Sequence, residues 1–387
     1  MSKSLQLARA FAGAGHRVIL TEIEKYRHSA HRHSFAVDRF VALPDPKSDP
    51  AGYADTMLQI FEEEQAAFLV PVSSPFGSSP DAAVGTRLRE GARAIHYSPE
   101  LTQLLDDKEK FCAEVSRLGL PGPEVKRITS PRDVLEHNFA EGRRYLLKSI
   151  NYDSIHRLER PVLPWPGMES HIESLPISEE SPWVLQEFLE GDEFCTHTVA
   201  HDGVIRLHGC SQSSPFQVNY DHVDHPAIEE WVTKFVAAHQ LTGQISFDFI
   251  VDAAGVPRPV ECNPRTHTAV TMFHDHPQLA HAYLEPSVTP DPEGTPIIYP
   301  LSDSKPTYWL GHEIWRFLGS RRNDQRREVM ARLRNGIDGV FRKRDPLPFL
   351  FLYHWQIPML LLKSLLRGGR WLKIDFNIGK LVEPDGD

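Results

Sequence analysis

The stretch PVECNPRTHT, residues 259–268, ends an apolar strand-like run with polar side chains at alternate positions, Glu261, Asn263 and Arg265. Side chains at alternate positions of a strand point to the same face of a sheet. Another acid, Asp248, lies upstream in the apolar segment SFDFIVD, and a Gly-containing turn separates the two acids. This pattern predicts a β-hairpin in which both acids face the same side of neighbouring strands.

The polar face of this hairpin has the chemistry of a metal site beside a phosphate. Asp248, Glu261 and Asn263 supply two carboxylates and an amide oxygen, which suit Mg²⁺, and proteins often hold Mg²⁺ with few carboxylates and substrate phosphates. Arg265 could bind a phosphate oxygen with two parallel hydrogen bonds. The alternative is a surface hairpin with solvated charges. That alternative predicts polar residues along both strands. These strands are otherwise apolar, and an acid on a buried strand needs a partner.

Composition restricts the class of protein. The chain has 387 residues, of which 41% are hydrophobic and 24% charged, as in soluble enzymes of two or three domains. Its net charge of −10 argues against nucleic acid as the partner, because phosphate backbones require a basic field, but a nucleotide needs only local positive charge. Four scattered cysteines and the absence of an apolar signal segment predict a reduced, cytoplasmic protein.

The most apolar run is PFLFLYHWQIPMLLLKSLL, residues 348–366. A membrane span needs about 20 mainly apolar residues. This run is interrupted by His354, Gln356, Pro358 and Lys363, so we do not expect a stable transmembrane helix. We expect an amphipathic segment that packs on the protein core, and contact with a membrane surface is the alternative.

Strand-like and helical segments alternate over roughly the first 100 residues, which predicts a parallel α/β unit. Helices are expected over 4–12, 51–65 and 81–90, and the apolar strands between them include FLVPV, residues 68–72. Nucleotide-binding units of this type begin with a strand and a Gly-rich turn, whereas this chain begins with a helix. Either a first strand is missing from this chain or the unit is atypical.

Further strands are expected beyond the first 140 residues. They cover 143–150, then 183–200 and 204–214 with a turn between them, and finally the hairpin 245–265. Residues 159–182 are rich in Pro, Ser and Glu and predict an exposed excursion.

Several other motifs are weak when each is taken alone. Lys148, within the apolar strand YLLKSI, either faces an anion or extends from an edge strand to solvent. Lys108 in LLDDKEKF alone suggests a solvated helix residue, and QEFLEG followed by Glu193 suggests a turn. The segment HSAHRHS, residues 28–34, is more typical of a solvated loop than of a metal site.

In the order in which they occur, these segments resemble the ATP-grasp superfamily over roughly residues 1–285. The matching motifs are DKEKF, the strand lysine, the hinge QEFLEGDE and the hairpin D-F…D-x-x-G…E-x-N-x-R. The resemblance implies an α/β and α+β fold with a Rossmann-like N-terminal domain, in which ATP lies between two lobes. It implies ATP and Mg²⁺ as cofactors, with Mn²⁺ as an alternative metal.

The resemblance also implies roles for individual residues. The residues that would contact the phosphates, base and ribose of ATP are Lys108, Lys148, Gln186, Glu187, Phe188, Leu189 and Glu193. Gln186 to Leu189 would form the adenine hinge through backbone groups, and Glu193 would hold the ribose. The implied metal ligands are Asp248, Glu261 and Asn263. Arg265 would stabilise the transferred phosphoryl group, and Lys148 is the second residue with an implied catalytic role.

The segment after the strand lysine departs from the family pattern. Family members have a Gly-rich lid at this point, whereas the chain has SINYDSIHR, residues 149–157. Ser149, Ser154 and Arg157 are the candidates to replace backbone N–H groups as phosphate ligands. Thr266 and His267 follow the hairpin directly and are candidate substrate contacts, with a satisfied core histidine as the alternative for His267.

A closer resemblance extends to the C-terminus. LLKSI-x-YDS, QISFDFI, ECNPRTH, HEIWR and WLKIDFNIGKL resemble the ATP-grasp ligases of mycosporine-like amino acid biosynthesis. Members of that family join an amino acid, typically glycine, to the cyclohexenone 4-deoxygadusol. The resemblance implies a carbon–nitrogen ligase with small-molecule substrates, and it leaves a homodimer open. The alternatives are a carboxylate–amine ligase that forms an acyl phosphate and a non-catalytic ATP-binding regulatory protein.

The same resemblance implies four parts of the chain. A Rossmann-like domain would cover 1–100, the small ATP-grasp lobe 101–185 and the large lobe with the metal hairpin 186–285. The remaining residues, 286–387, are Pro-rich at first and then helical and aromatic, and they would form a C-terminal extension.

Overall fold

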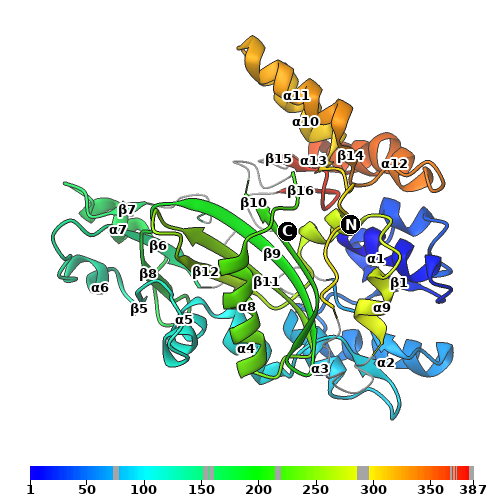
Figure 1. Cartoon of the computed structure of the whole chain (residues 1–387), viewed down its shortest axis with the longest axis horizontal. Coiled ribbons are helices and arrows are strands. Elements are labelled where there is room, and N and C mark those ends of the chain that lie inside the picture. Colours follow the sequence, from blue (N-terminus) through cyan, green and yellow to red (C-terminus); the bar gives the residue numbers. More distant parts are fainter. Residues whose placement is uncertain are drawn as a thin grey trace.

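The computed structural model of the chain describes residues 1–72, 78–150, 156, 161–213, 219–285, 296–366, 368, 371 and 373–382. Its elements form an N-terminal α/β region, two four-stranded antiparallel sheets and a helical C-terminal region (Figure 1). The two large sheets lie next to each other and together carry most of the predicted site residues (Figure 1).

The N-terminal region has the expected alternation of helices and strands. Its elements are α1 (Ser2–Gly13), β1 (Ile19–Ile23), η1 (Glu24–Tyr26), η2 (Ala30–His33), β2 (Arg39–Leu43), α2 (Pro50–Glu64), β3 (Phe68–Leu69), α3 (Ser78–Gly85) and β4 (Arg93–Ala94). β1 pairs with β2, and β3 with β4, both in parallel, as predicted. β3 is shorter than expected. It stops before Pro71, which has no N–H, and the Pro71 carbonyl instead accepts hydrogen bonds from Gln244 Nε2 at 2.8 Å and Thr266 Oγ1 at 2.9 Å.

The smaller of the two antiparallel regions follows. Its elements are α4 (Pro99–Asp106), α5 (Lys108–Arg117), β5 (Val125–Ile128), α6 (Pro131–Leu135), β6 (Tyr145–Ser149), β7 (Val162–Leu163), α7 (Glu169–Ser174) and β8 (Trp183–Glu187). The strand order is β5-β8-β6-β7, so β6 is an interior strand. β7 pairs only with Tyr145 and Leu146, at the end of β6 away from Lys148, and Lys148 itself pairs with Val184 of β8.

The prediction of an exposed excursion over 159–182 is wrong for the part of it that the structure describes. β7 pairs with β6, and α7 packs on α6. Leu163 and Ile172 are fully buried, and Leu175 is nearly so. A few widely spaced apolar residues close the core of this sheet, and the many Pro, Ser and Glu residues between them conceal that role in the sequence.

The larger sheet has the order β10-β9-β11-β12. The elements of this region are β9 (Asp192–His201), β10 (Val204–Gln212), α8 (Pro226–Ala238), β11 (Gly243–Val251) and β12 (Pro257–Asn263). α8 covers one face of the sheet (Figure 1), where Trp231 contacts the rings of Phe247 and Phe249, each at a centroid distance of 5.2 Å. Because side chains alternate along β11, Asp248 lies on the opposite face.

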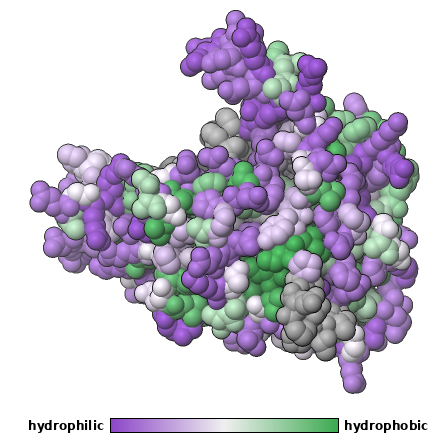
Figure 2. Space-filling view, viewed as in Figure 1, coloured by the Kyte–Doolittle hydropathy of each residue, from purple (hydrophilic) through white to green (hydrophobic). Residues whose placement is uncertain are grey.

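The region that follows β12 is mainly helical, as predicted for the described residues beyond 286. Its elements are η5 (Thr268–Phe273), α9 (Leu279–Leu284), β13 (Thr307–Tyr308), α10 (Leu310–Gly319), α11 (Asn323–Asn335), β14 (Ile337–Asp338), α12 (Leu347–Phe351), the π-helical turn η6 (Leu352–Gln356), α13 (Ile357–Leu366), β15 (Lys373–Asp375) and β16 (Lys380–Val382). This region shares one hydrophobic core with α1, in which Leu5 and Leu7 belong to the same cluster as Trp309, Leu352 and Phe376. α10 and α11 project from the body, and Figure 2 shows mostly hydrophilic side chains there.

Among the described residues, one helix is long and apolar enough to cross a membrane by length and composition, Leu347–Leu366. It runs through α12, η6 and α13. Leu352 and Ile357 are buried in the core, whereas Leu365 and Leu366 are exposed. One side of the helix therefore packs on the protein, as expected for an amphipathic segment, although its length equals that of a span.

Candidate active site

The hairpin places the two predicted acids opposite each other. β11 and β12 pair antiparallel with Asp248 facing Glu261 and Ser246 facing Asn263. The apolar residues of the two strands, such as Phe247 and Cys262, point to the other face and are buried. The sequence pattern thus becomes a polar strip on a sheet whose other face is core, and the solvated surface hairpin is excluded.

The acids on this strip affect each other strongly. Burial and, to a smaller extent, the charges of Glu261 and Glu193 together raise the pKa of Asp248 to about 8, against the opposing effect of Arg265 and Lys148. Glu193 lies near the start of β9, facing Ile250 of β11. Three carboxylates that repel each other in a partly buried place are stabilised by a bound cation.

The donor set fits Mg²⁺ held together with phosphates. Asp248, Glu261 and Asn263 offer hard oxygen atoms on one face of the hairpin. In the described part of the chain, no group of three His, Cys, Asp or Glu side chains is arranged to hold a metal alone. A site of two carboxylates and one amide therefore needs water and nucleotide oxygens to complete octahedral coordination, as is usual for Mg²⁺.

Arg265 is held beside the polar strip of the hairpin by two neighbours. Its Nη1 donates to Asp106 Oδ1 at 3.0 Å, and its Nη2 donates to Asn263 Oδ1. Asp106 is the last residue of α4, and burial raises its pKa while the Arg265 charge lowers it. Sequence reasoning missed Asp106. The only signal was its position just before the Asp107–Lys108 pair.

Lys148 connects the two sheets through Gln186. Lys148 Nζ donates to Gln186 Oε1 at 2.5 Å, and Gln186 Nε2 donates to the Val260 carbonyl at 3.1 Å. Gln186 is fully buried, so this bridge is shielded from water. The sequence motif assigned Gln186 to the hinge through its backbone, whereas its side chain orients the strand lysine toward the hairpin.

Lys108 is placed at the start of α5. Asp107 caps this helix by accepting from the N–H groups of Glu109 at 3.0 Å and Lys110 at 3.1 Å. Lys108 Nζ donates to the Ile150 carbonyl at 3.3 Å, just beyond β6. The lysine therefore lies where the predicted lid begins. The lid candidates Ser154 and Arg157 lie outside the described residues.

The predicted hinge follows β8. The N–H groups of Glu187 and Phe188 donate to the carbonyls of Glu124 and Arg144, each at 2.8 Å. These two N–H groups hold the sheet together, so a contact with a base would use carbonyl oxygens or Leu189, which lies beyond the end of the strand.

Gly191 brings the predicted hinge against the β11–β12 hairpin. A Cβ atom at this position would lie 2.0 Å from the Val251 carbonyl oxygen, so only glycine allows this approach of the two backbones. Glu193 follows two residues later on β9. This contact places the predicted hinge and Glu193 next to the hairpin that carries Asp248 and Glu261.

The two residues after the hairpin have structural contacts. Thr266 Oγ1 donates to the Pro71 carbonyl at 2.9 Å and also contacts Gln244 Oε1, which ties the hairpin to the N-terminal region. His267 Nδ1 accepts from the Ala269 N–H at 3.2 Å and caps η5, and burial lowers the pKa of His267 to about 3. His267 is therefore neutral.

The predicted solvated loop at 28–34 is only partly solvated. His31 is buried and contacts Ser4 Oγ at 3.1 Å and Ser29 Oγ at 2.8 Å. His31 therefore holds α1 in place and does not serve as a metal ligand.

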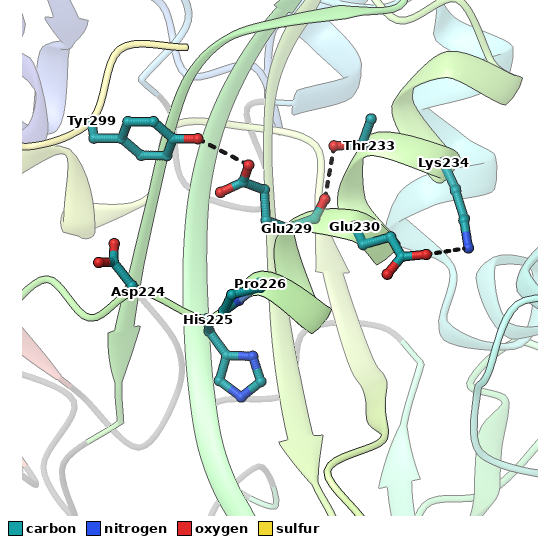
Figure 3. A pocket seen from close by; sticks show the side chains of 8 residues that line it. All are labelled: Asp224, His225, Pro226, Glu229, Glu230, Thr233, Lys234 and Tyr299. Carbon is teal, nitrogen blue, oxygen red and sulfur yellow. Dashed lines mark hydrogen bonds and ion pairs between the residues drawn. The ribbon is translucent and has the colours of Figure 1, made fainter.

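A surface pocket of about 500 Å³ lies on the exposed side of α8 (Figure 3). Glu229 accepts from Tyr299 Oη at 2.9 Å, and Lys234 pairs with Glu230 at 2.7 Å. None of the predicted nucleotide residues lines this pocket. The acidic lining of this pocket disfavours a phosphate, and the sheet separates the pocket from Asp248. The candidate nucleotide site therefore lies at the hairpin and not in this pocket.

No protein-family model matches the chain. The multifunctional protein pyr-3 of Neurospora crassa is 24% identical over 292 residues, or 69% of this chain and 15% of that protein. The carbamoyl phosphate synthase large chain of Archaeoglobus fulgidus is 26% identical over 238 residues, or 57% of this chain and 22% of that protein. The chain thus spans less than a quarter of either relative.

Solved structures share the fold at low identity. A biotin carboxylase of Campylobacter jejuni in a complex with beta-gamma-ATP has a TM-score of 0.55 at 15% identity, covering 74% of this chain and 70% of that one. The biotin carboxylase domain dimer of Hydrogenobacter thermophilus, in complex with MgADP and bicarbonate, has a TM-score of 0.54 at 14% identity, covering 74% and 69%. The L-amino acid ligase of Bacillus licheniformis has a TM-score of 0.50 at 17% identity, covering 72% and 66%. The chain therefore has the mixed α/β ATP-grasp fold that these structures share.

Proposed function

We propose that this protein is an ATP-dependent ligase that joins an amino acid such as glycine to the cyclohexenone 4-deoxygadusol and gives a mycosporine. The observation that carries the ATP-dependent part is the set of Asp248, Glu261, Asn263 and Arg265 on one face of the hairpin, with Lys148 directed toward it. The choice of acceptor is supported by the sequence motifs that resemble mycosporine ligases.

The residues of the site divide the work of phosphoryl transfer. Asp248, Glu261 and Asn263 would hold Mg²⁺, which neutralises charge on the phosphate oxygens when bound. Lys148 and Lys108 would bind phosphate oxygens of ATP. Arg265, oriented by Asp106, would stabilise the phosphoryl group during transfer.

The reaction follows from the chemistry of the acceptor. An enolised 1,3-dicarbonyl is a vinylogous carboxylic acid, so its enolate oxygen can attack the γ-phosphorus of ATP while the bond from that phosphorus to ADP breaks. The amine of glycine then attacks the carbon that carries the new phosphate. The carbon–oxygen bond breaks, inorganic phosphate leaves and the nitrogen loses a proton. Holding both reactants together supplies much of the rate.

A carboxylate–amine ligase that forms an acyl phosphate is the second candidate. It is favoured by the likeness to a protein named carbamoyl phosphate synthase and to one named L-amino acid ligase. The same residues would serve both reactions, because a carboxylate and an enolate attack phosphorus in the same way. A regulatory protein that binds ATP without turnover is the third outcome to be distinguished.

The test compares acceptors. ADP release is measured with glycine plus 4-deoxygadusol and with glycine plus simple carboxylates, each with Mg²⁺ and then with Mn²⁺. We expect ADP release only with the cyclohexenone and a new carbon–nitrogen product by mass spectrometry. Turnover with carboxylates alone would establish the second candidate. ATP binding without turnover on any acceptor would establish the third.

We also propose a cytoplasmic protein with small-molecule substrates. Its four cysteines are buried and unpaired, which suits a reducing compartment. A homodimer is proposed as well, because one related structure is described as a dimer.

A further inference from the structure

The helix Leu347–Leu366 has an apolar face that is exposed. The exposed apolar side chains along it are Leu350, Trp355, Leu362, Leu365 and Leu366. Leu365 is 68% exposed and Leu366 78%, and across the most apolar 18 residues of the helix only 22% are buried in the protein. A core helix would be mostly buried. A contiguous apolar surface of this kind marks a site of contact with a partner.

Two polar side chains of this helix lie on its inner side. Gln356 and Ser364 are buried, whereas the leucines next to Ser364 along the chain are exposed. Gln356 Oε1 accepts from the Ala30 N–H at 2.5 Å, and Gln356 Nε2 donates to the Gly379 carbonyl at 2.6 Å. An ordinary surface helix directs its polar residues to water and its leucines to the core. The outward leucines therefore suit an apolar environment better than water.

The inner side of the helix keeps it on the protein body. Leu352 is fully buried and Ile357 is nearly so, in the core that also contains Leu5 and Leu7. A helix that crossed a bilayer would lose this packing and the hydrogen bonds of Gln356. The geometry therefore fits a helix that stays packed on the protein and lies in the plane of a membrane surface, with its outer side chains in lipid.

The charge around this helix is opposite in sign to that of the whole chain. Residues 310–382, from α10 to β16, contain 15 Lys and Arg but only 6 Asp and Glu, a net charge of +9 in a chain of −10. Exposed cations occur before, within and after the helix, at Lys343, Arg344, Lys363 and Lys373. The acid next to Arg344, Asp345, is buried and pairs with Arg9 at 2.8 Å. Anionic lipid headgroups attract such a set of basic residues.

Two tryptophans accompany the leucines. Trp355 lies within the helix and Trp371 follows it, and they are 50% and 39% exposed. Tryptophan favours the boundary between hydrocarbon and headgroups, because its ring is apolar and its N–H is polar. Leucines, tryptophans and basic residues together are typical of a surface that binds a membrane.

A second copy of the chain is a poorer partner for this face. Both copies would bring the same exposed cations, so pairing the face with itself would place like charges near each other. Anionic lipids supply the opposite charge.

We propose that the exposed face of Leu347–Leu366 docks on the surface of an anionic membrane. Leu362, Leu365 and Leu366 enter the boundary of the lipid, and the basic residues around the helix contact the headgroups. This inference goes beyond the ligase function and holds whether or not the protein has that activity.

Vesicle sedimentation with the full chain tests the docking. The vesicles are phosphatidylcholine alone or phosphatidylcholine with about 30% phosphatidylserine, and the partition coefficient is obtained from the bound fraction. We expect the wild type to bind the anionic vesicles at least about tenfold more tightly than the neutral ones. Leu365→Glu/Leu366→Glu should weaken this binding at least about tenfold, because two apolar side chains become charged. The matched control is Val204→Glu on β10, an apolar position that is 49% exposed, and it should bind as the wild type does.

A change of charge tests the same face without altering its leucines. Lys363→Gln should weaken binding to the anionic vesicles about fivefold, as for the loss of one basic residue at such a surface. Lys234→Gln, on the exposed side of α8, is the matched control and should have no effect. Raising the salt to about 0.5 M should release the wild type, because the attraction to the headgroups is then screened.

Several outcomes would overturn the proposal. They are no binding of the wild type to anionic vesicles, equal binding to neutral vesicles, and unchanged binding by both Lys363→Gln and a correctly folded Leu365→Glu/Leu366→Glu protein. Analytical ultracentrifugation provides the remaining one. A wild-type dimer that Leu365→Glu/Leu366→Glu converts to a monomer would show that a second copy covers this face.

Discussion

At the scale of single residues, the alternation of side chains along the hairpin was sufficient to place Asp248 opposite Glu261. That inference is local, since it needs only strand periodicity and one turn. The pairing of Arg265 with Asp106 joins residues far apart in the sequence, and no local pattern predicts it. The side-chain role of Gln186 was missed for the same reason, because its partner Val260 lies on the other sheet.

Asp106 gives the first prediction at this scale. Asp106→Asn removes the charge that holds Arg265 at 3.0 Å, so the guanidinium is less well oriented for transfer. We expect kcat to fall by about tenfold or more while the KM for ATP changes little, because the interaction acts on the transition state. Steady-state kinetics provide the measurement.

The matched control is Asp55→Asn, which removes an exposed ion pair with Arg87 on the N-terminal region. It should leave kcat unchanged. If Asp106→Asn also leaves kcat unchanged, Arg265 does not depend on this carboxylate.

A buried histidine gives the pH prediction. His208 contacts Thr198 Oγ1 at 2.9 Å, and burial lowers its pKa to about 3. Since the unfolded chain binds the proton more readily, wild-type stability is lost as pH falls from about 6.5 toward 3. Relative to His208→Gln, the wild-type free energy of unfolding should decline by about 2 kcal/mol between about pH 7 and 5. Urea unfolding measures it, and a constant difference would show that His208 titrates normally.

At the scale of elements, the sequence indicated most helices and strands because their apolar periodicity is strong. It failed over 159–182, where β7 and α7 bury only a few residues among many Pro, Ser and Glu. The strand predicted from the sequence at β3 was also too long, because the contacts of Pro71 with Gln244 and Thr266 replace strand pairing there. In both places tertiary contacts decide what the local pattern leaves ambiguous.

Gly191 gives the prediction for the hinge. In Gly191→Ala the new methyl group would lie 2.0 Å from the Val251 carbonyl oxygen, so β8, β9 and β11 must shift apart. We expect a loss of about 1–3 kcal/mol in the free energy of unfolding and a raised KM for ATP. Gly13→Ala at the end of α1 is the control, since no atom lies within 4 Å of its Cβ position. Equal stability of the two variants would contradict the close approach at the hinge.

At the scale of the whole molecule, the fold class was predictable because the order of the motifs is that of a known superfamily. The packing of the C-terminal region on α1 was not, since residues from both ends of the chain build one core. The boundaries at residues 100, 185 and 285 remain a prediction. The shared core suggests that 286–387 and the N-terminal region stabilise each other.

Truncation tests this mutual stabilisation. A chain that ends at residue 285 loses Trp309, Leu352 and Phe376 from the core that contains Leu5 and Leu7. We expect the amide protons of α1 to exchange at least about tenfold faster by mass spectrometry, because their protection depends on this packing. The amides of β9 and β11 should keep most of their protection. Unchanged exchange in α1 would show that the extension is an independent domain.

The central claim is that the hairpin carboxylates hold the metal for phosphoryl transfer from ATP. The most direct measurement is ADP release, at saturating Mg²⁺ with glycine and 4-deoxygadusol, by the wild type, Glu261→Gln and the control Glu230→Gln on α8. We predict that Glu261→Gln folds normally by circular dichroism but loses at least about 10²-fold in kcat, while the control keeps wild-type activity. Wild-type ADP release by a correctly folded Glu261→Gln protein would contradict the assignment of this hairpin as the metal site.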